Sequence, residues 1–287
     1  MSPKMKNFIV RAITGALFVA IMVAGLLDPT AMIGLFALIT GLALWEYTGL
    51  VNNIENVCIN RFISTVAGVY LFVAIAGINS GIIQTNAAFV PYLLTVVYLF
   101  ISELYTRNAN AVNDWAYTML GQMYIALPLA CINVLAFRQQ PDGTISFYFL
   151  LPLSVYIFLW VNDTGAYLSG SLLGRHKLFP RISPGKSWEG SIGGGLLVLV
   201  VAALLGWWEN SHECLSGLSV IEWMGLGLVV VFFGTWGDLV ESLFKRTLGI
   251  KDSGSILPGH GGMLDRFDSS LMAIPASVIY IYSLTLL

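Results

Sequence analysis

Carboxylates and hydroxyls that could bind metal and phosphate lie between positions 238 and 268. Asp238 is followed by Ser242 and Lys245 at steps of four and three residues, so on a helix the three side chains would share one face. Asp265 and Asp268 are three residues apart. Oxygen ligands without sulfur or imidazole suit Mg²⁺ better than zinc. We therefore expect Asp238 and Asp265 to hold a divalent metal; the simpler alternatives are a structural Asp–Lys pair and helix N-capping.

A glycine cluster lies between these carboxylates. Gly259, Gly261 and Gly262 surround His260, and they would let the backbone approach a ligand and turn its N–H groups toward an anion. Taken alone, the cluster would indicate only a turn. We interpret it as a phosphate cradle and His260 as a hydrogen-bonding or structural residue rather than a base.

A second polar segment, residues 162–189, offers another phosphate site. Ser183, Lys186 and Ser187 come just before an expected helix, whose dipole and free N–H groups would favour an anion. The Gly-Lys-Ser run resembles the end of a P-loop, but Pro180 stands where that motif needs glycine and no strand precedes it, which excludes a Walker A motif. The alternative is a basic patch that touches anionic lipid headgroups.

The elements that must position these residues are membrane helices. The chain is 57% hydrophobic and only 10% charged, against roughly 25% charged in soluble domains. We predict an all-α, polytopic integral membrane protein with about nine transmembrane helices, each roughly 20 residues long. The expected spans are 8–27, 31–51, 61–78, 87–104, 115–136, 145–161, 190–208, 220–244 and 269–287.

Charge asymmetry predicts the orientation of these helices. If the N-terminus is cytoplasmic, 13 of the 14 Lys and Arg residues fall on or beside the cytoplasmic face, and only Arg138 lies outside. Residues 163–189 and 238–268 hold 15 of the 30 charged residues in 58 of 287 positions. We therefore expect 1–161 to form about six helices and 162–287 to be the catalytic part, with cytoplasmic polar segments at 162–189 and 245–268.

Other residue types give little functional signal. Cys58, Cys131 and Cys214 form no CxxC pair, so neither a disulfide framework nor a thiolate zinc site is indicated. The run from His212 to Cys214 lacks the second histidine of a zincin. We expect no nucleic-acid partner, and the sequence does not decide whether the helices pair into a homodimer.

Taken together, these motifs resemble the signature of phosphatidate cytidylyltransferases, also called CDP-diacylglycerol synthases. The signature includes Ser242, Lys245-Arg246, Lys251-Asp252, the 258–262 Pro-Gly-His-Gly-Gly run, Asp265-Arg266 and Asp268. The resemblance extends upstream through 237–239, 183–187 and 163–167, and in length and span count it fits a bacterial member. The first half of the chain carries no comparable motif, although Glu46 could belong to the same polar cleft.

This resemblance implies the reaction of CTP with phosphatidate, dependent on Mg²⁺ with room for a second cation, that gives CDP-diacylglycerol and pyrophosphate for phospholipid synthesis. It further implies an enzyme of the bacterial cytoplasmic (inner) membrane with its site facing the cytoplasm. In such an enzyme Asp238 and Asp265 would bind the metal, and Asp268 would ligate it or support a ligand. The expected phosphate-neutralising cations are Lys245, Arg246, Lys251 and Arg266. The expected substrate-binding residues are Asn162, Asp163, Ser183, Lys186, Ser187, Ser242, Asp252, Gly259, His260, Gly261, Gly262 and Asp268.

Two other functions fit parts of the pattern. A CTP-dependent lipid-alcohol kinase of the dolichol or phytol kinase type would move the γ-phosphoryl group and release CDP rather than pyrophosphate. An ion-coupled transporter could use Asp238 and Glu241 as an intramembrane ion site, but it would leave the charged cytoplasmic segments unexplained.

Overall fold

The computed structural model describes residues 3–106, 110–140, 142–212, 216–256, 259 and 261–285. Contacts divide the chain into two compact units, each of which includes a late segment of the sequence. Unit 1 consists of Met1–Phe149 and Leu248–Phe267, and unit 2 consists of Leu150–Thr247 and Asp268–Leu287. The expected functional division at 161/162 stays a prediction, because packing contacts do not test where chemistry occurs.

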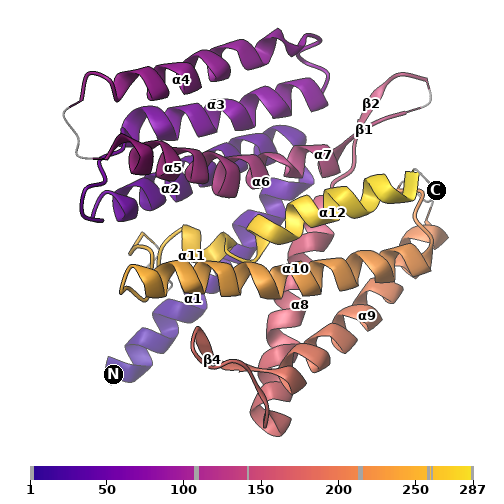
Figure 1. The fold of residues 1–287 in the computed structure, drawn as a ribbon. Coiled ribbons are helices and arrows are strands. Elements are labelled where there is room, and N and C mark those ends of the chain that lie inside the picture. The colour runs from indigo at the N-terminus through magenta and orange to yellow at the C-terminus, as the bar shows by residue number, and fades with distance from the viewer. Residues whose placement is uncertain are drawn as a thin grey trace. The chain divides into compact units, whose positions relative to one another are not determined.

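Unit 1 is built from helices of unequal length (Figure 1). Its main helices are α1 (Pro3–Leu27), α2 (Pro29–Val51), α3 (Arg61–Asn79), α4 (Val90–Ser102) and α5 (Ala111–Gly121). Its shorter elements are η1 (Asn86–Phe89), η2 (Gln122–Ala126), α6 (Leu127–Ala130), α7 (Ile132–Ala136), the strands β1 (Phe137–Gln139) and β2 (Ile145–Phe147), and α11 (Leu264–Phe267).

Local sequence signals explain where α2 begins. The Asp28 carboxylate accepts a hydrogen bond from the Ala31 N–H at 2.8 Å, and Pro29 occupies the first turn, where its missing N–H costs nothing. Deeper in the unit, the ring of Phe267 meets Phe18 and Phe36 edge-on, with centroids 6.0 and 6.2 Å apart. This aromatic cluster packs α11, which follows the glycine-rich loop, against the first two helices.

The described residues of unit 2 form four long helices and one hairpin. They are α8 (Leu150–Leu173), β3 (Lys177–Phe179), β4 (Ser183–Ser187), α9 (Trp188–Ser211), α10 (Val220–Thr247) and α12 (Ser270–Thr285). The antiparallel β3–β4 hairpin joins α8 to α9, and α12 runs alongside α10 (Figure 1). Glycines allow close contact between α8 and α9, since a Cβ on Gly165 would lie 2.9 Å from the Gly194 Cα.

The prediction of a helical, polytopic membrane protein is confirmed. Six described helical segments are long and apolar enough to cross a bilayer: Pro29–Val51, Arg61–Asn79, Ala111–Ala136, Trp188–Ser211, Val220–Thr247 and Leu264–Leu284. The other three of the nine expected spans coincide with helices that do not meet this standard. Ala12–Leu27 and Asn86–Ser102 are apolar but shorter, and α8 carries Asn162 and Asp163 in its second half.

Two local features differ from the expectation. We expected residues 162–189 to form a loop, but α8 continues to Leu173, so Asn162 and Asp163 lie inside a helix. The apolar run ends near Val161, whereas the backbone hydrogen bonds of the helix continue into the polar region. The sequence also predicted only helices, but Ser183–Ser187 is a strand paired with β3, and β2 delays the start of the sixth expected span to Leu150.

Candidate active site

A polar cavity in unit 2 collects the predicted residues of the second polar segment. The cavity has a volume of about 190 Å³, and Asn162 and Asp163 of α8 line it together with Lys186 and Ser187. Ser187 is the N-cap of α9, where its hydroxyl accepts a hydrogen bond from the Gly190 N–H at 3.1 Å. The first turn of a 24-residue helix and a lysine therefore border one small cavity, an arrangement that favours an anion.

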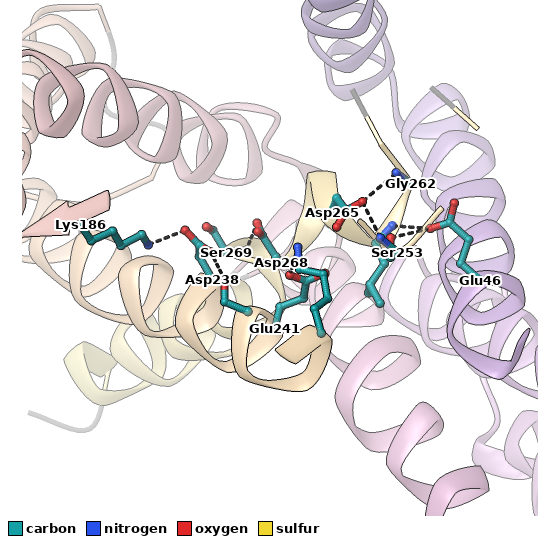
Figure 2. A network of polar contacts seen from close by, with 12 residues as sticks. Glu46, Lys186, Asp238, Glu241, Ser253, Gly262, Asp265, Asp268 and Ser269 are labelled. Atoms are coloured by element: carbon teal, nitrogen blue, oxygen red, sulfur yellow. Dashed lines mark hydrogen bonds and ion pairs between the residues drawn. The ribbon is translucent and has the colours of Figure 1, made fainter. Parts of the chain in front are cut away.

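Asp238 on α10 links this region to the second motif. One carboxylate oxygen, Oδ1, accepts a hydrogen bond from the Ser242 hydroxyl at 3.1 Å, and the other forms an ion pair with Lys186 (Figure 2). Both charged side chains keep more than a quarter of their surface exposed, so the pair is not sealed inside the protein. The spacing correctly placed Ser242 beside Asp238, but the cation at Asp238 is Lys186.

Lys245, which we expected to share the face of Asp238, pairs with a different carboxylate. Its ammonium lies 2.5 Å from Glu241, whose side chain is fully buried. A buried carboxylate without a counter-charge would be strongly unfavourable, and Lys245 compensates the charge of Glu241. The same lysine also interacts electrostatically with Asp268.

Gly237 brings the start of α12 against α10. A Cβ at this position would lie 2.8 Å from the Asp268 carbonyl oxygen and 3.0 Å from that of Ser269, so only glycine fits. Asp268 interacts electrostatically with Asp238 and with Asp163. Figure 2 shows the Asp268 and Asp238 side chains near Ser269. Asp268 therefore interacts with two other predicted carboxylates of unit 2.

Asp265 belongs to a separate network in unit 1. Its Oδ2 accepts hydrogen bonds from the Gly262 N–H at 2.8 Å and the Ser253 N–H at 2.9 Å (Figure 2). Glu46 of α2 accepts from the N–H groups of Met263 at 2.8 Å and Leu264 at 2.9 Å, and from the Ser253 hydroxyl at 3.2 Å. Two buried carboxylates thus fix the backbone of the glycine-rich loop.

The remaining predicted residues lie on more open surfaces. Arg246, Lys251, Asp252 and Arg266 are exposed, and Ser183 is half-buried on β4. Gly259 and Gly261 have φ angles of 76° and 82°, which only glycine adopts easily, so the loop does use their conformational freedom. His260 lies outside the described residues.

Three contributors had weaker signals in the sequence. Glu46 had no motif around it, and the one available signal was a carboxylate inside an otherwise apolar helix. Tyr167, the last residue of the 163–167 motif, and Thr235 also line the polar cavity, although neither was among the predicted site residues.

The donor set of unit 2 fits a hard cation such as Mg²⁺. Asp238, Asp268 and the Ser242 hydroxyl offer oxygen only. No group of three or more His, Cys, Asp or Glu side chains arranged for a metal occurs in the described part of the chain. This sparse set suits Mg²⁺, which commonly takes one or two carboxylates and completes its shell with water and substrate phosphates.

Comparison with known proteins identifies the class to which this fold and site belong. The cytidylyltransferase family matches residues 6–284, so the chain belongs to that family. It is 32% identical over 267 residues to the phosphatidate cytidylyltransferase of Staphylococcus aureus, which covers 93% of this chain and 96% of that protein. The Staphylococcus epidermidis enzyme of that name gives the same figures. The Haemophilus influenzae enzyme is 32% identical over 255 residues, 84% and 87% of the two chains. The resemblance drawn from the signature is confirmed.

Proposed function

We propose that this protein is a phosphatidate cytidylyltransferase, which converts CTP and phosphatidate to CDP-diacylglycerol and pyrophosphate. Family membership and relatives of that name, matched along nearly their whole length, support this activity. The structural observation that carries it is Asp238, which contacts Ser242 and Lys186 beside a polar cavity. A carboxylate, a hydroxyl and a lysine beside a helix N-terminus suit phosphate chemistry.

The reaction needs positioning and charge neutralisation more than proton transfer. A phosphate oxygen of phosphatidate forms a new bond to the α-phosphorus of CTP, and the bond to the β-phosphate breaks as pyrophosphate leaves. The attacking oxygen is already ionised near neutral pH, so no general base is required. The obstacle is the repulsion between two anionic substrates, which cationic and N–H groups reduce.

Lys186 and the first turn of α9 form the anion-binding part of this proposal. The ammonium and the helix N-terminus border the same cavity, so a phosphate there would contact both. Binding would also give Lys186 an alternative partner to Asp238 and thereby free that carboxylate for a cation. Lys245, Arg246, Lys251 and Arg266 are the proposed additional neutralising charges.

Mg²⁺ would supply Lewis-acid stabilisation of the phosphate charge. Asp238 is the proposed primary ligand, and Asp268 and Ser242 are neighbouring oxygen donors in the same unit. Asp265, the second predicted ligand, already uses one carboxylate oxygen for its own loop. Its part in metal binding remains a proposal, as does a second cation.

We propose that the site faces the cytoplasm, where CTP is found. The support is the distribution of Lys and Arg along the sequence, which places the polar segments 162–189 and 245–268 on the side of the N-terminus.

Isotope position distinguishes the proposed reaction from lipid phosphorylation. Purified protein in detergent receives phosphatidate, Mg²⁺ and CTP that carries ³²P at either the α or the γ position. We expect α-label in a lipid product and γ-label in pyrophosphate, and loss of both products with excess EDTA. Transfer of the γ-label from CTP to an added lipid alcohol would indicate a kinase. Ion flux in liposomes without any labelled lipid would indicate a transporter.

A further inference from the structure

An apolar groove lies between α9 and α10 in unit 2, next to the polar cavity. Its volume of about 460 Å³ falls in the usual range for ligand pockets, roughly 300–1,000 Å³. The side chains that form most of its walls are Ile192, Leu196 and Leu199 on α9, and Leu228, Val231 and Phe232 on α10. Neither the sequence motifs nor the chemistry at Asp238 uses this groove.

The groove and the polar cavity adjoin each other. Ser191 and Thr235 line both, one from each helix. Thr235 precedes Asp238 by three residues, which is less than one helical turn. On the polar side of this boundary lie Lys186 and Asp163. The apolar groove therefore lies beside a cation, Lys186, which pairs with the proposed metal ligand.

We infer that the groove binds an acyl chain of phosphatidate while the phosphate occupies the polar cavity, an assignment that rests on the proposed function. Phosphatidate joins an anionic phosphomonoester directly to apolar chains, and the site joins a lysine and a helix N-terminus directly to an apolar groove. A bilayer phospholipid with a large zwitterionic headgroup lacks the compact anion that this cavity suits. The positive charge in the polar cavity thus favours a lipid with a compact anionic headgroup, and the acyl chain of that lipid would fill the groove.

The floor of the groove offers a position at which this assignment can be tested. Gly195 is buried and lines the groove, and a Cβ there would meet only the Val231 side chain, at 3.6 Å. A larger side chain at Gly195 would therefore fill the groove. Gly195 lies four residues beyond Ser191 on α9, or about 6 Å, so a very short acyl chain that starts at Ser191 would end before it.

The test compares Gly195→Leu with the unmodified protein on dioleoyl and dibutyryl phosphatidate in the same detergent. We expect Gly195→Leu to raise the KM for the dioleoyl substrate about threefold or more, because the blocked groove loses its packing contacts with the chain. The KM for dibutyryl phosphatidate and the KM for CTP should not change. Gly34→Leu is the matched control, since Gly34 is exposed on α2 and a Cβ there meets nothing within 4 Å. Equal effects on both substrates, or no effect on either, would overturn the inference.

A binding measurement separates this inference from the proposed activity. Trp188 and Trp236 line the groove, so phosphatidate with brominated chains should quench their fluorescence more than brominated phosphatidylcholine does. Gly195→Leu, or replacement of both tryptophans by Phe, should remove the difference. Selective quenching without CDP-diacylglycerol formation would support the groove and reject the proposed function. CDP-diacylglycerol formation with equal quenching by both lipids would reject the groove.

Discussion

Asp238 combines contacts that suit a ligand-binding carboxylate better than a purely structural one. One oxygen accepts from Ser242 and the other pairs with Lys186, yet the side chain stays partly exposed. The Glu241–Lys245 pair a short distance along α10 differs, because the Glu241 side chain is fully buried and that of Lys245 is mostly buried. The Asp238–Lys186 pair is therefore more open to a ligand than the Glu241–Lys245 pair.

Replacement of Asp238 by Asn should reduce cytidylyl transfer by about 100-fold or more, because the amide keeps the size but loses the charge that a cation requires. The measurement is the rate of α-label transfer from CTP by purified protein. Asp142→Asn, the same change at an exposed position of the β1–β2 hairpin, is the control and should retain normal turnover. Turnover of Asp238→Asn within a few-fold of normal would remove the metal assignment.

Glu46 is a residue whose role is positional. Replacement by Gln should destabilise the protein by about 1–3 kcal/mol, since an amide cannot accept from all of the donors that the two carboxylate oxygens satisfy. Thermal unfolding in detergent and proteolysis of the 253–262 loop measure the effect. The exposed carboxylate Glu55 provides the comparison: Glu55→Gln should leave both measurements unchanged. Identical melting of the two variants would show that the loop does not depend on Glu46.

At the scale of elements, the contact between α8 and α9 depends on small residues. Gly194→Ala would place a Cβ 2.6 Å from the Asn162 Oδ1 and 2.7 Å from its carbonyl oxygen. We expect a loss of about 1–3 kcal/mol from this overpacking, seen as a lower melting temperature. The adjacent Gly195→Ala meets only a side chain at 3.6 Å and should melt normally. Equal melting temperatures of Gly194→Ala and Gly195→Ala would contradict close packing at this contact.

The positions of most elements could be predicted because the bilayer imposes a length of apolar sequence on each helix. The expected spans from 31–51 and 61–78 nearly coincide with α2 and α3. The end of α8 could not be predicted this way, because hydropathy detects the edge of the apolar region and not the end of helical hydrogen bonding. The β3–β4 hairpin was missed because its residues, with Pro184 and Gly185 in one strand, lack the alternation of an ordinary strand.

For the whole molecule, labelling of single cysteines measures the orientation in the membrane. After replacement of Cys58, Cys131 and Cys214 by Ala, a single cysteine is introduced as Gly185→Cys or Asp142→Cys, both at exposed positions. A membrane-impermeant maleimide should label position 142 from outside intact spheroplasts and position 185 only in inverted vesicles. Labelling of both positions from one side would refute the proposed orientation.

Motifs in the sequence predict candidate site residues, whose roles stay predictions, but they do not predict how these residues pair. Motifs predicted Asp238, Asp265, Lys186 and Asp163 as residue types suited to phosphate chemistry. The partnership of Lys186 with Asp238 spans 52 positions, and only the packing of the helices brings the two together. Spacing along one helix favoured Lys245 instead, because local periodicity carries no information on a neighbouring element.

The hydrogen bonds of Glu46 also set an order of events during synthesis. Its amide donors at residues 263 and 264 follow it by 217 and 218 positions, and at roughly 5–20 residues per second they emerge roughly 10–40 s after it. During that interval the Glu46 carboxylate on α2 lacks the hydrogen-bond donors that it has in the finished protein, because the loop that supplies them has not yet been synthesised. A chain that stops before Ser253 would never supply these donors, so the first helices and the last loop must mature together.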